Sequence, residues 1–408
     1  MIKEIFELQN PWRFKASFSF NLKDRDIISH IINNLDNNKI IGLIGSRQVG
    51  KSSIIFLMIQ HLIRKNTPPQ SIFYFNLDDL KLQELFYDIP EFIQFIGKEN
   101  ARKFIFIDEI QRLKNPGLFL KELYDLGLNI KIIYSGSSQL EIKSKLKEHL
   151  VGRARQFEIH RLSFSEYLSF ASPVTKKQAL ADMLVFGSYP AVALETQKFE
   201  KKMILKDIYQ SYIEKDITDF LRVENTQAFN LMAGLLANQS GQLLNIDNLA
   251  TSLKITRNET EKHISILEQT FIIKRIYPFY KNYKKEITKT PKIYFMDLGL
   301  RNYATNNYND IDHRNDQGNL FENFFLLELL CKDQLSQNKI NFWRTTNQTE
   351  IDFIVTGENG VEAIEVKWEK ETIPKSFQTI VRYYPEISTK IVTKKYFLGT
   401  AISSGINS

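Results

Sequence analysis

The sequence predicts an α/β domain followed by a helical region and a C-terminal α+β domain. From Lys39 to about Phe157, short apolar runs alternate with longer amphipathic stretches, the pattern of strands and crossover helices in a parallel sheet. Between Leu162 and about Leu236 the strand-like runs disappear and helical periodicity dominates. After Tyr294, a helical stretch precedes three runs with strand character. The length of 408 residues, at about 150 residues per domain, agrees with several domains.

Composition and charge narrow the class of protein. The chain is 43% hydrophobic and 25% charged, which excludes a disordered or fibrous protein. A net charge of +7 favours anionic partners without specifying one. Cys331 is the only cysteine, which excludes an internal disulfide and a cysteine-rich metal site and indicates a reducing compartment, so we expect a cytoplasmic protein. No signal peptide or membrane anchor is visible, so we expect no membrane contact.

Five segments follow in order. Residues 1–38 form a lead-in with a turn at Asn10-Pro11-Trp12 and a short helix near Ile28, and residues 39–160 form the α/β domain. Residues 161–236 are a helical module. Residues 237–292 contain two helices, at 245–255 and 256–273, and resemble a winged helix-turn-helix. Residues 293–408 form the α+β domain, with a helix at 320–335 and strands in INFWRTT, EIDFIV and VEAIEVKW.

A phosphate-binding motif lies between the first expected strand, 40–44, and a helix over 53–63. Its glycines let backbone N–H groups surround phosphate oxygens, Lys51 meets the β and γ charges, and the hydroxyl of Ser52 binds Mg²⁺. ATP and Mg²⁺ are therefore the expected cofactors, and the alternative is a glycine-bearing turn before a helix. The expected nucleotide-binding residues are Gly45, Ser46, Arg47, Gln48, Val49, Gly50, Lys51, Ser52 and Ser53.

Two carboxylates end a later apolar strand, 103–107, where open α/β sheets bind their ligands. Asp108 suits binding of Mg²⁺, and Glu109 suits orienting and deprotonating the water that attacks the γ-phosphate. The pair indicates ATP hydrolysis. The alternative is that the two residues simply end a strand or cap a helix.

Two further groups are candidates for contact with the γ-phosphate. Ser135 or Ser137, after the strand 131–134, would lie beside the carboxylates if the two strands are neighbours, although Ser-Gly-Ser-Ser is also a common turn. Arg153 and Arg155 are candidates for an arginine that neutralises transition-state charge, in cis or from a neighbouring subunit.

These motifs together resemble the AAA+-type P-loop ATPases of bacteria and archaea that carry a C-terminal restriction-endonuclease-like domain of unknown function. Ser46 and Arg161 replace prolines that are usual in that family, and we interpret the position of Arg161 as a local turn. The resemblance implies an ATPase core and covers most of the chain. It is carried by GSRQVGKS at 45–52, FNLDD at 75–79, FIDEIQ at 106–111, SGSS at 135–138, LVGR at 150–153, LSFSEYL at 162–168, GSYP at 187–190, YIEKDI at 212–217, LFENFF at 320–325 and EIDF at 350–353.

A second site is predicted in the last domain. Asp352, Glu365 and Lys367 have the Asp, Glu-x-Lys spacing of metal-dependent nucleases, with Glu322 as a fourth member. A four-residue loop at 357–360 would place Asp352 opposite Glu365, about 5 Å apart, where both would bind Mg²⁺ while Lys367 stabilises the charged reaction centre. The alternatives are a solvated charge cluster on an ordinary hairpin and a decayed nuclease kept for binding.

One feature of the sequence favours contact with DNA, and another argues against it. Residues 277–285 interleave aromatic residues with lysines after the expected recognition helix, 258–271. That helix carries Glu259, Glu261 and Glu268, which suit a DNA groove poorly, so a packing role for the winged helix is equally open.

The sequence thus predicts a Mg²⁺-dependent ATPase whose ATP cycle rearranges attached DNA-binding and nuclease-like modules. DNA, a protein partner and a second copy of the chain are candidate partners. The alternative function is a nucleotide-gated regulator that acts through protein contacts and carries an inactive nuclease-like domain.

Overall fold

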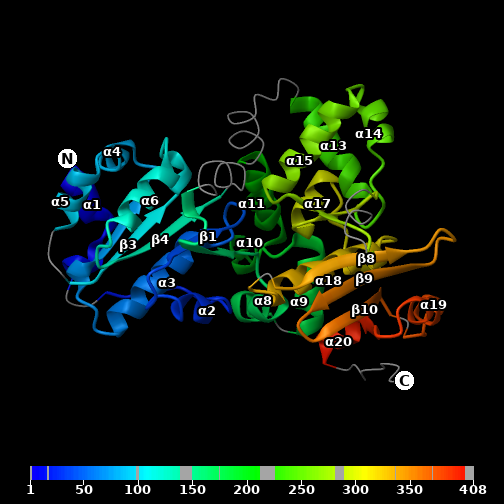
Figure 1. Cartoon of the computed structure of the whole chain (residues 1–408). Coiled ribbons are helices and arrows are strands. Elements are labelled where there is room, and N and C mark those ends of the chain that lie inside the picture. Colours follow the sequence, from blue (N-terminus) through cyan, green and yellow to red (C-terminus); the bar gives the residue numbers. More distant parts are fainter. Residues whose placement is uncertain are drawn as a thin grey trace. The chain divides into compact units, whose positions relative to one another are not determined.

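The computed structural model describes residues 2–15, 18–97, 101–137, 149–173, 175–211, 226–280, 289–335, 337–369 and 371–399 (Figure 1). The chain divides into two units, Met1–His160 and Arg161–Ser408, and each is treated by itself. No helix among the described residues is long and apolar enough to cross a membrane.

The first unit is built on a parallel sheet in the order β2-β3-β4-β1-β5. Four of these strands are almost wholly buried, as their apolar sequences require, whereas β5 is largely accessible. The predicted α/β domain with a parallel sheet is confirmed. The strands are β1 (Ile40–Ile44), β2 (Ile72–Asn76), β3 (Lys103–Asp108), β4 (Ile130–Gly136) and β5 (Ala154–Glu158).

Helices connect these strands. The predicted helix at 53–63 is α3 and begins two residues earlier, at Lys51. Gly50 precedes the helix in a left-handed backbone conformation, which glycine adopts without steric cost. The helices of this unit are α1 (Ile2–Gln9), α2 (Ile28–Ile32), α3 (Lys51–Arg64), α4 (Leu80–Glu84), α5 (Ile89–Ile96) and α6 (Pro116–Asp125), with short 3₁₀ turns η1 (Pro11–Arg13), η2 (Pro69–Ser71) and η3 (Ile110–Arg112).

The lead-in covers the edge strand β2. The side-chain amide of Asn10 both donates to the carbonyl of Tyr74 and accepts from its N–H, each at 2.8 Å, and Gln9 accepts from the N–H of Asn76 at 2.9 Å. Side-chain amides thus occupy backbone groups that an uncovered edge strand would expose. The helix α1, which supplies Gln9, was not predicted.

The second unit begins with helices and ends with a mixed sheet of order β11-β10-β9-β8. Strands β8, β9 and β10 pair antiparallel, and β10 pairs parallel with β11. The predicted helix at 320–335 and the three strands after it are confirmed as α18, β8, β9 and β10. The C-terminal elements are α18 (Gln317–Lys332), β8 (Lys339–Arg344), β9 (Glu350–Gly357), β10 (Gly360–Lys367), α19 (Lys375–Tyr383), β11 (Ser388–Thr393) and α20 (Lys394–Leu398).

Before this sheet lie a helical stretch and a small helical group with a hairpin. The hairpin pairs β6 with β7 antiparallel, and the two predicted helices before it are present as α14 and α15. The second helix ends at Gln269, four residues earlier than predicted, and Ile273 begins strand β6. The elements are α8 (Phe164–Ala171), α9 (Lys176–Phe186), α10 (Pro190–Leu194), α11 (Lys198–Ser211), α13 (Thr226–Asn238), α14 (Ile246–Leu253), α15 (Arg257–Gln269), β6 (Ile273–Ile276), β7 (Lys292–Phe295), α17 (Leu298–Ala304) and the 3₁₀ turn η5 (Ile311–His313).

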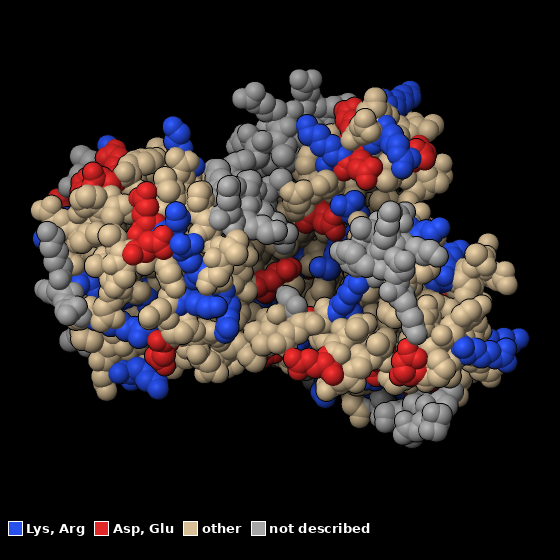
Figure 2. All heavy atoms as spheres, viewed as in Figure 1, with Lys and Arg blue, Asp and Glu red and all other residues tan. Residues whose placement is uncertain are grey.

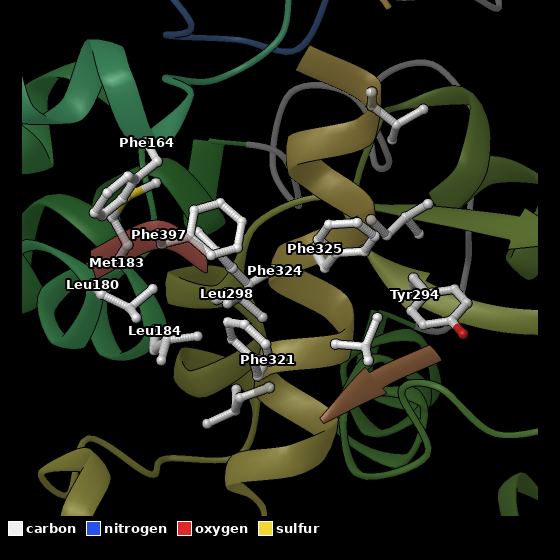
Figure 3. Close-up of a cluster of buried hydrophobic side chains, with 14 of the residues drawn as sticks. Phe164, Leu180, Met183, Leu184, Tyr294, Leu298, Phe321, Phe324, Phe325 and Phe397 are labelled. Atoms are coloured by element: carbon white, nitrogen blue, oxygen red, sulfur yellow. The ribbon is translucent and has the colours of Figure 1, made fainter. Parts of the chain in front are cut away.

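One hydrophobic core joins the helical stretch to the C-terminal sheet (Figure 3). Phe397 of α20 packs against Phe164 of α8 and Phe324 of α18, with ring centroids 5.5 and 4.9 Å apart. Residues that the sequence assigned to separate segments, 161–236 and 293–408, therefore share a buried interior. They are expected to fold together, because neither set of apolar faces is covered alone.

Arg161 lies at a bend, in agreement with its interpretation as a local turn, and its side chain is in addition a buried anchor in this unit. Its guanidinium donates to the carbonyl of Met296 and, at 2.8 Å, to the hydroxyl of Tyr189, and it lies 3.6 Å from the carboxylate of Asp297. These contacts compensate the free-energy cost of burying the charged guanidinium.

Candidate active site

The phosphate-binding motif forms the turn between β1 and α3. Gln48 and Gly50 take left-handed backbone conformations, with φ of 58° and 96°. At Gly45, a Cβ atom would lie 2.3 Å from the carbonyl oxygen of Ile159, so only glycine fits. The loop is thus shaped both by its own glycines and by the chain that follows β5.

Lys51 and Arg25 hold this loop. The ammonium of Lys51 donates to the carbonyl oxygens of Gly45 and Ser46, at 3.0 and 2.8 Å, and so lies across the loop. Arg25 donates to the carbonyls of Val49 and His160, both at 2.8 Å. Sequence reasoning missed Arg25, because no motif links it to a loop twenty residues further along the chain.

Asp108 is the last residue of β3. It lies at the same end of the sheet as the C-terminus of β1, because the two strands run parallel. It is 2% exposed. Ser135 of the neighbouring strand β4 donates to one carboxylate oxygen, and the hydroxyl of Tyr74 donates to the other at 3.0 Å. Burial and then Asp108 raise the pKa of Tyr74, so its hydroxyl keeps the proton it donates.

Glu109 follows with a left-handed backbone, φ 58°, which a glutamate adopts only where its surroundings impose it. Its N–H donates to Ser135 at 3.2 Å. Its carboxylate accepts from the amide of Gln111, which also donates to Ser137 at 3.1 Å. Gln111 therefore links the carboxylate to Ser137, the residue that follows β4. The sequence contained this glutamine within FIDEIQ, but its spacing indicated no role.

Arg153 and Arg155 lie at the N-terminal ends of the parallel strands, whereas the phosphate loop lies at their C-terminal ends. The carbonyl of Arg153 accepts from the N–H of Ile40, the first residue of β1, and its guanidinium pairs with Asp125 at 2.9 Å. Arg155 donates to Asn34. Since β1 rises about 3.3 Å per residue, the phosphate loop, which begins five residues later, lies roughly 17 Å away, and the predicted action of Arg153 in cis is wrong.

Some predicted positions lie outside the described residues: Ser138, the motif at 212–217 and residues 281–285 of the aromatic and basic segment.

The second cluster combines β9, β10 and α18. Gly357 pairs with Gly360 and Phe353 with Ile364, so the hairpin loop has two residues and not four, while the predicted register is correct. Asp352 accepts from the N–H of Val366 at 2.8 Å. Burial, and then the charges of Glu322 and Glu365, raise the pKa of Asp352 well above its usual value.

Basic side chains occupy the same cluster. Lys367 lies 2.6 Å from one oxygen of Glu365, whose other oxygen is buried with no hydrogen-bond partner in the described part of the chain. Lys292 of β7, which sequence reasoning missed, lies 2.6 Å from Glu350 and 3.3 Å from Glu322. Within the described residues, no three His, Cys, Asp or Glu side chains are arranged to hold a metal ion.

A cavity of about 610 Å³ lies between α14, α15 and the hairpin β6–β7. Two of its cations are paired: Arg257 with Asp247, and Arg275 with Glu268 at 2.6 Å. On the face shown in Figure 2, basic and acidic side chains are likewise interspersed. This region therefore presents no surface of one sign for the backbone of a nucleic acid among the described residues.

Residues 37–168 match the family described as an AAA domain. Residues 177–310 and 317–400 match two families described as domains of unknown function, DUF8612 and DUF4143. The chain thus carries an AAA domain, which implies nucleotide binding, followed by two regions whose families have no assigned function.

Relatives extend over most of the chain. An uncharacterized protein of Methanocaldococcus jannaschii is 25% identical over 380 residues, covering 87% of this chain and 82% of that protein. An uncharacterized protein of Haemophilus influenzae is 25% identical over 390 residues, covering 92% and 94%.

Two solved structures of low similarity also match. AMPPCP-bound DnaA from Aquifex aeolicus has a TM-score of 0.33 and 15% identity, covering 60% of this chain and 86% of that one. The ORC2 protein of Aeropyrum pernix has a TM-score of 0.32 and 11% identity, covering 80% and 99%.

Proposed function

We propose that the first unit is a Mg²⁺-dependent ATPase. The observation that carries this proposal is the position of Asp108 and Glu109 at the edge of the sheet where the phosphate loop begins. A triphosphate bound by the loop would have its terminal phosphate near these carboxylates, which is the arrangement that hydrolysis needs.

The loop supplies positive groups without large movement. Its N–H groups and the helix α3 present positive partial charges to an anion. Lys51 already points over the loop, where it donates to the carbonyls of Gly45 and Ser46. On binding, the ammonium exchanges these carbonyl oxygens for phosphate oxygens. Both sets are acceptors, so the exchange leaves no donor unsatisfied.

Ser52 and Asp108 are the groups that would hold Mg²⁺. Asp108 fits this role because its buried carboxylate is oriented by neutral donors, Tyr74 and Ser135, which leave its negative charge uncancelled. Mg²⁺, when bound, neutralises charge on the phosphate oxygens.

Glu109 would orient the attacking water and accept its proton. Its carboxylate must point in one direction for this, and Gln111 restrains it through a bridge to Ser137. Gln111 is therefore proposed as a positioning residue. Ser135 donates to Asp108 and accepts from the backbone of Glu109, so it holds the two carboxylates in relation to each other.

The test is ATP binding and turnover by three variants. Lys51→Ala should abolish ATP binding, and Glu109→Gln should bind ATP and turn it over at least about 100-fold more slowly. Lys65→Ala, at the exposed far end of α3, is the matched control and should behave as wild type. Normal turnover by Glu109→Gln would refute the assignment.

We further propose that ATP binding and hydrolysis in the first unit change the activity of the second unit. The domains that the sequence suggested, a winged helix at 237–292 and a restriction-endonuclease-like domain at 293–408, make DNA binding one candidate output. The paired cations around the 610 Å³ cavity favour the other candidate, a regulator that acts through protein contacts.

A single assay separates these outputs. ATP turnover is measured with and without single-stranded DNA, duplex DNA or RNA, and the nucleic acids are examined for cleavage. Cleavage that requires Mg²⁺ and disappears in Asp352→Ala would favour a nuclease. Absence of stimulation and of cleavage by any nucleic acid would favour the regulator.

A further inference from the structure

The acidic cluster of the second unit contains a lysine that the metal-site prediction did not include. Lys292 begins strand β7 and is 2% exposed. Its ammonium lies 2.6 Å from an oxygen of Glu350 and 3.3 Å from an oxygen of Glu322. The ammonium therefore stands among carboxylates from β9 and α18, where a metal-dependent nuclease would need its ion.

The remaining carboxylates of the cluster also have partners. Glu350 uses its second oxygen to accept from Arg344 at 3.0 Å, and Glu365 pairs with Lys367. Asp352 accepts from a backbone N–H. In the described structure, four carboxylates thus face three cations: Glu322, Glu350, Asp352 and Glu365 against Lys292, Arg344 and Lys367.

Such a cluster offers little to a divalent ion. Mg²⁺ requires near-octahedral oxygen coordination, and its affinity for a protein site rises with the carboxylate charge that remains uncancelled. The second oxygen of Glu365 is the one carboxylate oxygen of the cluster that is both buried and unpartnered among the described residues. Among the described residues, no three His, Cys, Asp or Glu side chains are arranged to hold a metal ion.

We propose that the ammonium of Lys292 takes the place of a metal ion in this cluster. Its ion pairs hold strand β7 against α18 and β9, and the cluster binds no divalent metal. Tyr294, two residues along β7, supports the same attachment. Its hydroxyl donates to Glu322 at 2.5 Å and points away from the hydrophobic core in Figure 3. The cluster is therefore an ion-paired clamp between the hairpin and the C-terminal sheet. This proposal does not depend on ATP hydrolysis by the first unit.

The first experiment measures Mn²⁺ uptake by electron paramagnetic resonance, on the full chain without nucleotide. Wild type and Asp352→Asn are compared, so that any binding outside the cluster is common to both. The expected result is equal uptake at Mn²⁺ concentrations up to about 1 mM, a range that covers the weaker divalent sites of proteins. A site present in wild type and lost in Asp352→Asn would overturn the proposal.

The second experiment tests the clamp by thermal unfolding. Lys292→Met leaves the partly buried carboxylates of Glu322 and Glu350 without this cation and should lower Tm by roughly 6 °C or more. Lys289→Met, an exposed lysine three residues earlier, is the matched control and should leave Tm within about 1 °C of wild type. An unchanged Tm in Lys292→Met would overturn the proposal.

A double variant isolates the ion pair from packing. Glu350→Gln should lower Tm in the wild-type background and cost less in the Lys292→Met background, because one of its two partners is already absent and only Arg344 remains. Fully additive losses would contradict the pairing. If Lys292→Met does not fold, the comparison of Mn²⁺ uptake by wild type and Asp352→Asn still decides the question.

Discussion

The two acidic clusters of this chain differ in what holds their carboxylates. Asp108 and Glu109 receive hydrogen bonds from neutral groups, the side chains of Tyr74, Ser135, Gln111 and Ser137. In the C-terminal cluster, neutral donors are joined by charged ones: three of the four carboxylates, Glu322, Glu350 and Glu365, pair with the side chains of Lys292, Lys367 or Arg344. Neutral donors orient a carboxylate and leave its charge for a metal ion, whereas a lysine or arginine cancels that charge.

A matched pair of substitutions tests this difference most directly. Asp108→Asn should lower ATP turnover at least about 100-fold, because the group that would hold Mg²⁺ is lost. Asp352→Asn makes the same chemical change in the other cluster and should leave turnover within about twofold of wild type. Steady-state ATPase rates of the two purified variants measure both effects. An equal loss in both would mean that the clusters act in one reaction.

The loop beside the first cluster should tolerate no side chain. Gly45→Ala would place a methyl group against the carbonyl of Ile159 and should abolish tight ATP binding, with a destabilisation of about 2–3 kcal/mol. Gly318→Ala in α18 is the control, because a Cβ atom there meets nothing within 4 Å. It should leave stability unchanged or raise it by up to about 1 kcal/mol. Calorimetric unfolding and nucleotide titration measure the two effects.

The neutral bridge to Glu109 should contribute less than the carboxylate itself. Gln111→Ala should lower kcat about 10-fold with little change in KM, since the amide orients the base and does not bind ATP. Ser137→Ala removes the second half of the bridge and should add little once Gln111 is gone. A change confined to KM would indicate that Gln111 contacts the nucleotide and does not position Glu109.

The smallest expected effect is the loss of stability on substitution of Asp316, a carboxylate of the second unit that is paired with two arginines. Burial acts to raise the pKa of Asp316, but hydrogen bonds from Arg314 and Arg301, each at 2.8 Å, lower it to about 2. Because the folded pKa lies below the unfolded value of 3.8, this stabilisation is complete above about pH 4 and is lost as the pH falls toward 2.

The variant Asp316→Asn should therefore be less stable than wild type at pH 6 by about 1 kcal/mol, after allowance for solvent screening. The difference should shrink below pH 4. Asp312→Asn, at an exposed position nearby, is the control. Urea unfolding at a series of pH values gives the comparison, and a difference that grows on acidification would have the wrong sign.

Much of the first site could be predicted because its parts are adjacent in sequence. The strand β1, the loop and α3 follow one another, and the run 103–109 shows a strand that ends in carboxylates. The register of β9 and β10 was also predictable, since a short loop fixes which residues face each other.

The error at Arg153 has a physical cause. Strand β5 is an edge strand whose residues are mostly accessible, so it lacks the apolar run that reveals the interior strands. Without that strand, the sequence did not show that Arg153 precedes it. In a parallel sheet the residue before a strand lies at the edge opposite the phosphate loop.

The sequence by itself determined the phosphate-binding motif, the two carboxylates after the strand 103–107 and most of the strands and helices, because these follow from spacing and hydrophobic periodicity along neighbouring residues. Only the tertiary structure decided which distant side chains complete each cluster: Arg25 beneath the loop, Tyr74 beside Asp108, and Lys292 among the C-terminal carboxylates. The charge that a carboxylate retains depends on such neighbours, and these are brought together by packing and not by their distance along the chain.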